Sequence, residues 1–371
     1  MNIVVIIIIL LFSRNVYATD KVSESFDIGG YISSLNDVVK NEEGIDVDLN
    51  SIYSNIINGK DEEKKNIIQK VVAVIVSQIK ETIKASTALI LIILLETILS
   101  SLELDKNSQA VKISKLVIII SATTILLKNY IQVQEILKNT IKTILYLLEL
   151  STTFLTGVLV ATGKITTTGT IAPLIMFVTS IILTITNYIF IPLFNLAIVA
   201  HITSEISDEI KLEKLANLFR KSSMFIFTTC ISIFVFVLAL ENTITKSVDS
   251  IYFKTTQNIV ADSVPVVGKF LADSLETVLG ATELVGKVGG TLSIISAVLI
   301  IIVPVIKLVI IMAIYKIISS ICQMVSYNKS LGNIIDFFAN IYKDMLGIII
   351  GTMVVFISVT GIIMYTISKI T

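Results

Sequence analysis

The sequence predicts an all-α membrane protein: a polytopic helix bundle with Pro-broken helices and a short polar N-terminal region. Two observations on the whole chain predict this fold class. Of the 371 residues, 54% are hydrophobic and only 16% are charged, whereas soluble domains carry about 45–50% apolar and about 25% charged residues. Apolar runs near the length of about 20 residues that crosses a bilayer as a helix recur from residue 85 onward. We therefore expect a multi-pass protein of the lipid bilayer.

Composition also excludes several classes of function. The formal net charge is zero, so no basic surface indicates nucleic acid as a partner. Cys230 and Cys322 lie far apart in apolar runs, without metal-ligand spacing, and are expected to be packed thiols. The single histidine, His201, ends an apolar run and is expected at an interface rather than as a ligand. Without catalytic motifs, the chain is expected to be no enzyme and to hold no cofactor or metal.

Residues 1–18 are typical of a secretory signal peptide. An apolar core from Ile3 to Phe12 precedes Val16-Tyr17-Ala18, a small-x-small cleavage pattern loosened by valine. No Lys or Arg precedes the apolar core, so an uncleaved N-terminal anchor is the alternative. If the signal is functional, residues 19–84 form a polar and amphipathic helical region on the extracytoplasmic side.

That region begins acidic and becomes helical from Asp61. Its apolar residues recur three and four positions apart, as on one face of a helix: Ile67, Ile68, Val71, Val72, Ile75, Val76 and Ile79. Such a helix lies on the membrane, on a partner, or on its own transmembrane bundle. The multi-span membrane domain is expected to cover residues 85–371.

The first half of this domain predicts several spans with acidic residues inside them. The first span is Ala85 to Leu102, which contains Glu96. A short apolar run from Leu116 needs the residues up to Val133 to cross the membrane. A helix with charges on one side follows, and Ile144 to Thr162 is expected to span again, with Glu149 inside it. Lysines in the loop 103–115 favour a cytoplasmic position for that loop.

A Thr-rich segment, 161–170, comes next and contains Gly163 and Gly169. Glycine and β-branched threonine weaken a helix, so this segment is expected to be a loop or a re-entrant turn. Non-helical backbone at membrane depth is tolerated where it is buried in protein or lines water. The segment therefore either lines a passage or is a short interfacial loop.

Topology depends on the apolar run from Ile171 to His201, which contains Pro173 and Pro192. The run is either one long broken helix or two short spans. Two crossings are expected, because they place all lysine-rich loops on the cytoplasmic side, whereas one crossing would swap the sides of the later loops. A span from Ser222 to Leu240 follows, and the amphipathic segment 241–290 would then face outside.

The longest apolar run, Thr291 to Cys322, contains Pro304 and Lys307. Proline removes one backbone donor and clashes with the preceding turn, so a break or bend is expected at Pro304. The last span is expected from Leu346 to Ile367.

Charges in the spans are the candidate functional residues. A lipid-facing charge costs a few kcal/mol or more, so Glu96, Glu149 and Lys307 should face the bundle interior, a partner or water. The alternatives are an ion pair that closes the bundle, or snorkelling near a helix end. Glycines near residues 264–290 allow close backbone approach or hinges. The candidate residues for function or assembly are Lys307, Pro304, Glu149, Glu96, Pro265, Gly268, Gly280, Gly289 and Gly290.

An ordered set of short motifs resembles a known family. The set comprises Pro265-Val266-Val267-Gly268, Asp273-Ser274, Thr277-Val278-Leu279-Gly280, Gly286-Lys287-Val288-Gly289, Pro304-Val305-Ile306-Lys307-Leu308 and Ile314-Tyr315-Lys316. In this order and spacing it resembles the stage III sporulation protein AE family, over about residues 85 to 371. The N-terminal region is similar in character only.

The resemblance implies a function. It implies a membrane subunit of the channel-like, secretion-system-like complex that links mother cell and forespore during endospore formation and sustains late forespore development. Implied partners are the other subunits of that complex, ring-forming proteins and a secretion-type ATPase, and the implied location is the mother-cell membrane facing the forespore. The alternative is a stand-alone secondary transporter of a small solute.

Overall fold

The structure is a computed structural model that describes residues 27–41, 49–58, 63–102, 109–207, 209–263, 268–325 and 329–368. Throughout these ranges the regular elements are helices and no strand occurs, which confirms the all-α prediction. The predicted signal peptide, residues 1–18, lies outside the described residues, as does Pro265.

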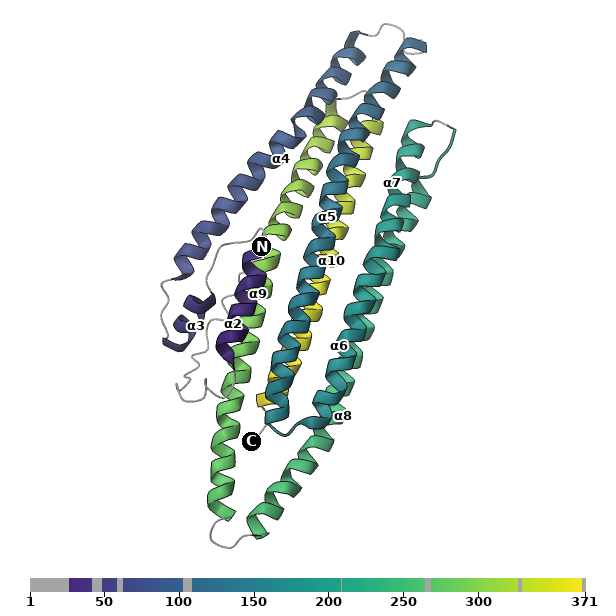
Figure 1. Cartoon of the computed structure of the whole chain (residues 1–371). Coiled ribbons are helices and arrows are strands. Elements are labelled where there is room, and N and C mark those ends of the chain that lie inside the picture. The colour runs from purple at the N-terminus through teal and green to yellow at the C-terminus, as the bar shows by residue number, and fades with distance from the viewer. Residues whose placement is uncertain are drawn as a thin grey trace.

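The helices form an elongated bundle (Figure 1). In chain order they are α2 (Ile28–Asn41), α3 (Leu49–Asn58), α4 (Glu63–Leu102), α5 (Gln109–Ala161), α6 (Ile165–Ile185), the π-helical turn η2 (Thr186–Phe190), α7 (Ile191–Ile206), α8 (Glu213–Ser263), α9 (Gly268–Val325) and α10 (Lys329–Ser368). Among the described residues, five segments are long and apolar enough to cross a membrane: Ile113–Ala161, Ile165–Ile206, Glu213–Leu240, Thr282–Val325 and Lys329–Ser368. The chain is therefore multi-pass.

Helix α10 is at the centre of the packing. It contacts α9, α5, α8 and α7, while α6 and α7 pack with α8 as a second layer. Its fully buried side chains include Phe338, Tyr342 and Phe356. Because apolar residues lie on most of its surface, α10 can bury contacts on several sides at once.

The run from Ile171 to His201 belongs to one continuous helical segment, so the predicted double crossing is wrong. Helix α6, η2 and α7 form one continuous apolar segment, Ile165–Ile206. Pro192 is the second residue of α7 and lacks the backbone N–H that a continuous helix would use. The π-helical turn ahead of it absorbs the change in hydrogen bonding. The predicted irregularity at a proline is thus a local π-helical turn that leaves the chain direction unchanged.

The two spans expected between residues 116 and 162 are also one helix. Helix α5 has 53 residues, so it is about 80 Å long, against about 30 Å for the hydrocarbon core of a bilayer. Its apolar ends flank a polar middle, where Lys128, Gln132, Glu135, Lys138 and Lys142 are exposed.

Each of these two corrections removes one predicted crossing, so together they leave the predicted side of the later loops unchanged. The C-terminal ends of α4, α7 and α9 and the N-terminal ends of α5, α8 and α10 lie toward one end of the bundle (Figure 1). The C-terminal ends of α5 and α8 and the N-terminal ends of α6 and α9 lie toward the other end. Lys115, Lys211 and Lys316, described residues of the three lysine-bearing regions, therefore lie on segments that meet at the first of these ends. The sidedness of 241–290 stays a prediction, and this arrangement is compatible with it.

The Thr-rich segment is a tight turn rather than a long loop. Helix α5 ends at Ala161 and α6 begins at Ile165, and Gly163 has a positive φ of 77°. The expected loop over 161–170 is therefore shorter than predicted and covers residues 162–164. The following threonines belong to α6, where the Thr168 hydroxyl donates to the Lys164 carbonyl at 2.9 Å. The Lys164 ammonium donates to the Thr366 carbonyl in the last turn of α10, where a cation is favoured.

The N-terminal helices pack on the bundle. The Tyr31 ring of α2 stacks on Phe154 of α5 with ring centroids 4.0 Å apart. Its hydroxyl bonds to Ser293 of α9 at 2.5 Å. Helix α4 continues through residues 84 and 85, where the predicted membrane domain begins, and packs on α9 and α5. The first span, 85–102, extends beyond the described side chains and stays a prediction.

Candidate functional site: a polar groove beside Lys307

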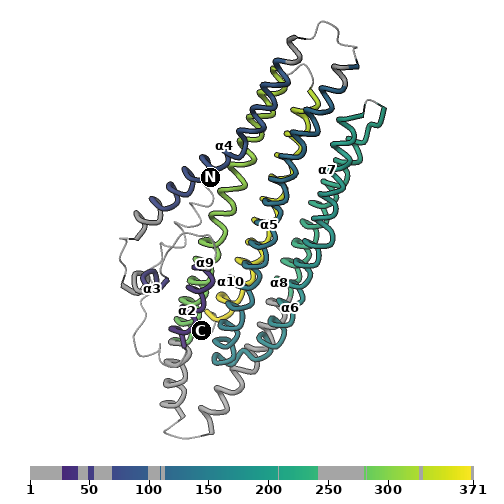
Figure 2. Tube along the Cα trace, turned by 45° about the horizontal axis from the view of Figure 1, so that its top comes forward, coloured from purple at the N-terminus to yellow at the C-terminus, as the bar shows by residue number. Residues whose placement is uncertain are grey.

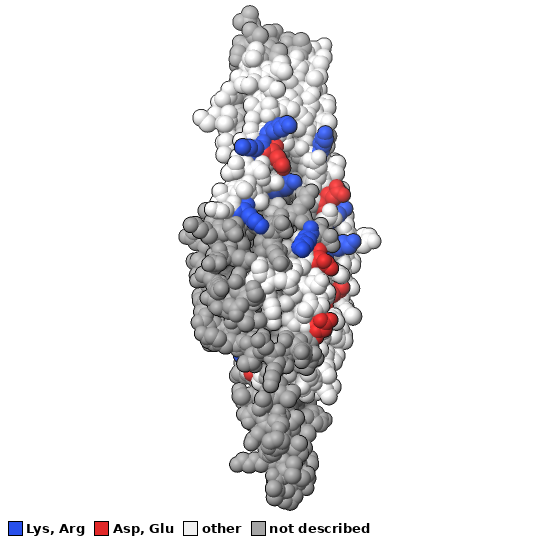
Figure 3. Space-filling model, turned by 60° about the vertical axis from the view of Figure 1, so that its left-hand side comes forward, with Lys and Arg blue, Asp and Glu red and all other residues white. Residues whose placement is uncertain are grey.

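A groove of about 990 Å³ lies between α4, α5 and α9. Helix α4 diverges from the bundle toward its N-terminal end (Figures 1 and 2). Residues of α4 between Gln78 and Ser86 line the groove. The lining residues are Gln78, Glu81, Thr82, Ala85, Ser86, Asn129, Gln132, Val133, Glu135, Ile136, Asn139, Thr140, Lys142, Thr143, Tyr146, Ile300, Val303, Pro304, Lys307, Ile311 and Tyr315. On the face of the molecule that carries α4, charged side chains gather in a band (Figure 3).

Each helix contributes one stripe of residues to the groove. Helix α9 contributes Ile300, Pro304, Lys307, Ile311 and Tyr315, which recur at steps of three or four as one helix face requires. The polar middle of α5 supplies most of the opposite wall. The sequence indicated this wall only as a helix charged on one side, because nothing local shows which helix it faces.

Two contacts fix the level of Lys307 on α5. Helices α5 and α9 run antiparallel: Asn129 bonds to Tyr315 at 2.7 Å, and Phe154 lies against Gly289. Lys307 precedes Tyr315 by eight residues along α9. It is therefore level with about residue 137 of α5, in the middle of the polar stretch.

Lys307 differs from the other α9 lysines whose side chains are described. Lys287 pairs with Glu283, and Lys316 pairs with Asp336 at 2.6 Å. Lys307 is half-buried, and the described part of the chain offers it neither an ion pair nor a hydrogen bond. It belongs to Thr282–Val325, whose most apolar stretch of 18 residues has a mean hydropathy of 3.1, the highest among the five segments. The alternative of an ion pair closing the bundle is therefore not realised among the described residues.

The two acidic candidates do not join Lys307. Glu96 of α4 is buried, with 7% of its surface exposed, and its Oε2 atom has no hydrogen-bond partner among the described residues. Glu149 of α5 is exposed and lies outside the groove lining. Pro304, by contrast, lies in the groove wall one turn from Lys307. Helix α9 continues through it, so the helix is not broken at this proline, and the predicted bend stays a prediction.

The glycine candidates divide by position. A Cβ atom at Gly289 would lie 2.3 Å from Cε1 of Phe154, and one at Gly290 would lie 2.4 Å from Cγ of Met364. These two glycines allow α9 to approach α5 and α10 closely. Gly280 is exposed, with nothing within 4 Å of its ideal Cβ position, and Gly268 is the first residue of α9.

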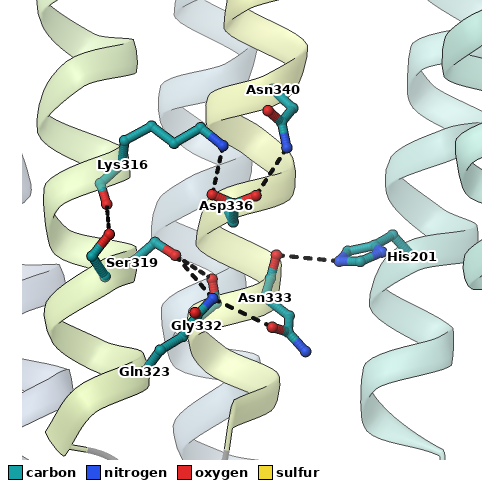
Figure 4. A network of polar contacts seen from close by, with 9 residues as sticks. His201, Lys316, Ser319, Gln323, Gly332, Asn333, Asp336 and Asn340 are labelled. Carbon is teal, nitrogen blue, oxygen red and sulfur yellow. Dashed lines mark hydrogen bonds and ion pairs between the residues drawn. The ribbon is translucent and has the colours of Figure 1, made fainter.

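A second polar cluster joins α7, α9 and α10 (Figure 4). The Ser319 hydroxyl donates to the Gly332 carbonyl at 2.8 Å, and Asp336 accepts from Lys316 and Asn340. His201 is buried: its ring stacks on Phe337 and its Nε2 lies 3.3 Å from the Asn333 carbonyl oxygen. The sequence analysis did not predict this cluster. The only indication in the sequence is that polar residues are frequent on both sides of residues 326–328.

Within the described residues, no group of His, Cys, Asp and Glu is placed to hold a metal ion. What the groove offers is a set of amides and hydroxyls, two acids and two lysines. This arrangement can bind or pass polar groups along the bundle.

Residues 47–367 match the family model for stage III sporulation protein AE. A curated relative, stage III sporulation protein AE of Bacillus subtilis (strain 168), is 26% identical over 169 residues, which are 46% of this chain and 42% of that relative. The alignment thus spans less than half of the relative's length. No solved structure matches the chain. The family model begins within the polar N-terminal region and ends within α10, so the chain belongs to the stage III sporulation protein AE family.

Proposed function

We propose that this chain is a membrane subunit of the channel-like, secretion-system-like complex that links mother cell and forespore and that late forespore development needs. It would lie in the mother-cell membrane facing the forespore, with ring-forming proteins and a secretion-type ATPase as partners, and would itself be no enzyme. The single observation that carries the proposal is the polar groove beside Lys307, which has no partner among the described residues, in a helix bundle of a sporulation family.

The dimensions of the groove support a passage. Along α5 its lining extends from Asn129 to Tyr146, a length of about 26 Å. That length is close to the thickness of about 30 Å of a bilayer's hydrocarbon core. Polar side chains along such a path are costly against lipid, so they are expected to face water or a protein partner.

A stand-alone transporter of a small solute is the second candidate. The groove volume of about 990 Å³ favours it, because small-molecule sites are about 300–1,000 Å³. Against it, α9 is continuous at Pro304, whereas many transporters bind solutes between half-helices. Reconstitution of the purified chain alone separates the two: a transporter moves a solute, and a subunit of a larger complex does not.

The test of the proposal uses the sporulating cell. We expect deletion of the chain to block late forespore gene expression, and the tagged chain to co-purify with ring-forming proteins. Lys307→Ala should lower the yield of heat-resistant spores or the recovery of the complex. The matched control is Lys138→Ala, because Lys138 is exposed on α5 at the level of Lys307 but outside the groove lining.

Normal late gene expression in the deletion strain would overturn the proposed function. Normal spore yield and complex recovery in the Lys307→Ala strain would instead remove only Lys307 from it.

A further inference from the structure

The groove has two unlike walls. The α9 wall is apolar apart from one cation and the Tyr315 hydroxyl, with Ile300, Val303, Pro304 and Ile311 around Lys307. The facing wall, from α4 and α5, carries amides, hydroxyls and charges. An apolar wall with a single fixed charge suits a guest that has both a polar and an apolar part.

The charged residues of the groove indicate that the polar part of the guest is negatively charged. The other charged residues of the groove are Glu81, Glu135 and Lys142, and all three are exposed, so water stabilises them. Lys307 is half-buried in the membrane-length segment that has the most apolar stretch, and no described residue pairs with it. A charge in such surroundings is expensive unless water or an opposite charge reaches it. The groove is the side from which an anion can reach the Lys307 ammonium.

We infer that the groove binds the anionic group of an amphiphilic guest, a phosphate or a carboxylate, at Lys307. Asn139 and Gln132, on the α5 wall near the same level, supply amide donors, and the apolar α9 wall holds the non-polar body of the guest. The inference rests on the proposed function for its physiological setting, in which such an anion occupies the passage. The anion comes either from a lipid headgroup or from a soluble molecule, and the experiment separates these sources.

The chain has no tryptophan, so Ile311→Trp places a single fluorescent reporter on the groove wall. The full-length chain with this reporter is reconstituted in vesicles that contain brominated phosphatidylglycerol or brominated phosphatidylcholine. We expect the anionic lipid to quench the reporter at lower mole fraction than the zwitterionic one. Lys307→Gln should reduce this preference about fivefold, the factor for one lysine–lipid contact. Lys138→Gln, with a lysine outside the groove removed, should leave it unchanged.

A second variant protects the test against misfolding of Lys307→Gln. Asn139→Asp keeps Lys307 and adds a negative charge to the opposite wall, so it should also weaken the preference for the anionic lipid. A second arm titrates inorganic phosphate into the reporter protein in neutral detergent. A phosphate-dependent fluorescence change that Lys307→Gln abolishes, without any lipid preference, assigns the site to a soluble anion.

The inference is overturned if neither lipid charge nor phosphate gives a response that depends on Lys307. That result would leave the proposed function standing, because complex recovery and spore yield are measured independently of anion binding.

Discussion

The side-chain amide of Asn129 donates a hydrogen bond of 2.7 Å to the hydroxyl of Tyr315, and so joins α5 to α9 at one end of the groove. The Tyr315 ring in turn meets Tyr342 of α10 edge to face, with centroids 5.5 Å apart. One polar contact between residues 186 positions apart in sequence thus ties a groove wall to the central helix.

Tyr315→Phe removes this bond and should lower the free energy of unfolding by about 1 kcal/mol, the usual net value of one hydrogen bond. The measurement is thermal unfolding of the full chain in detergent. Tyr188→Phe is the control, because Tyr188 is 78% exposed. Equal melting temperatures for the two variants would show that the Asn129–Tyr315 contact contributes nothing to stability.

Close packing at Gly289 predicts a second effect. In Gly289→Ala the new Cβ would lie 2.3 Å from the Phe154 ring, which itself stacks on Tyr31. Overpacking of this kind costs about 1–3 kcal/mol, and it should loosen α2 from the bundle. Limited proteolysis of the N-terminal region measures the release of α2.

Gly280→Ala provides the matched control, since it adds the same methyl group to the same helix where nothing lies within 4 Å. It should be neutral or stabilising by up to about 1 kcal/mol, because alanine favours a helix more than glycine. A greater loss of stability at Gly280 than at Gly289 would contradict the packing argument.

The ion pair between Arg220 of α8 and Asp344 of α10 has an N–O distance of 3.1 Å and side chains only 18% and 15% exposed. Removing one partner leaves the other charge partly buried, so Arg220→Ala should cost about 2–3 kcal/mol, somewhat less than for a fully buried pair. The neighbouring Lys221→Ala removes an exposed charge and should be nearly neutral. A double-mutant cycle with Asp344→Ala that gives no coupling energy would refute this role of the pair.

Tyr31 predicts a pH dependence. The Ser293 hydroxyl donates to the Gly289 carbonyl at 2.7 Å, so Tyr31 must be the donor in its bond to Ser293. Burial raises the pKa of Tyr31 above its ordinary value near 10. In the unfolded chain the hydroxyl ionises at about pH 10 while the folded chain keeps its proton. The contribution of Tyr31 to stability is therefore complete below pH 10 and falls as the pH rises above it.

The measurement compares the wild-type chain with Tyr31→Phe by denaturant unfolding between about pH 8 and 11. The difference in unfolding free energy between the two should shrink or change sign above pH 10. Lysine titration affects both chains alike, so a constant difference across this range would argue against the buried hydroxyl as the cause.

Sidedness is testable with single cysteines in a chain from which Cys230 and Cys322 have been removed. Glu209→Cys lies in the α7–α8 connection and Ala161→Cys at the α5–α6 turn, and both positions are exposed. A membrane-impermeant thiol reagent should label Ala161→Cys from outside and Glu209→Cys only after permeabilisation. The same labelling at positions across 241–290 extends the test to the amphipathic segment. If Glu209→Cys were labelled from outside and Ala161→Cys only after permeabilisation, the predicted sidedness of every loop would be wrong.

The helical fold, the membrane location and the family resemblance were all predictable from the sequence. The length of an apolar run and the presence of a charge within it are local properties of the sequence. The sequence around Lys307 is therefore enough to predict a charge inside a membrane span, without knowledge of the fold. Tertiary packing decided the rest. Pro192 was expected to interrupt its helix, but a π-helical turn lets the helix continue. Residues 161–170 were expected to form a loop, but the turn covers only 162–164.

The groove was beyond sequence reasoning for a related reason. Its walls come from α4, α5 and α9, and Lys307 faces residues near position 137 only because two distant contacts, at Tyr315 and at Gly289, set the register. Periodicity shows which face of a helix is polar, since that face follows from neighbours three and four residues away. Which helix it meets depends on packing between segments far apart in the chain, and only the tertiary structure contains that information.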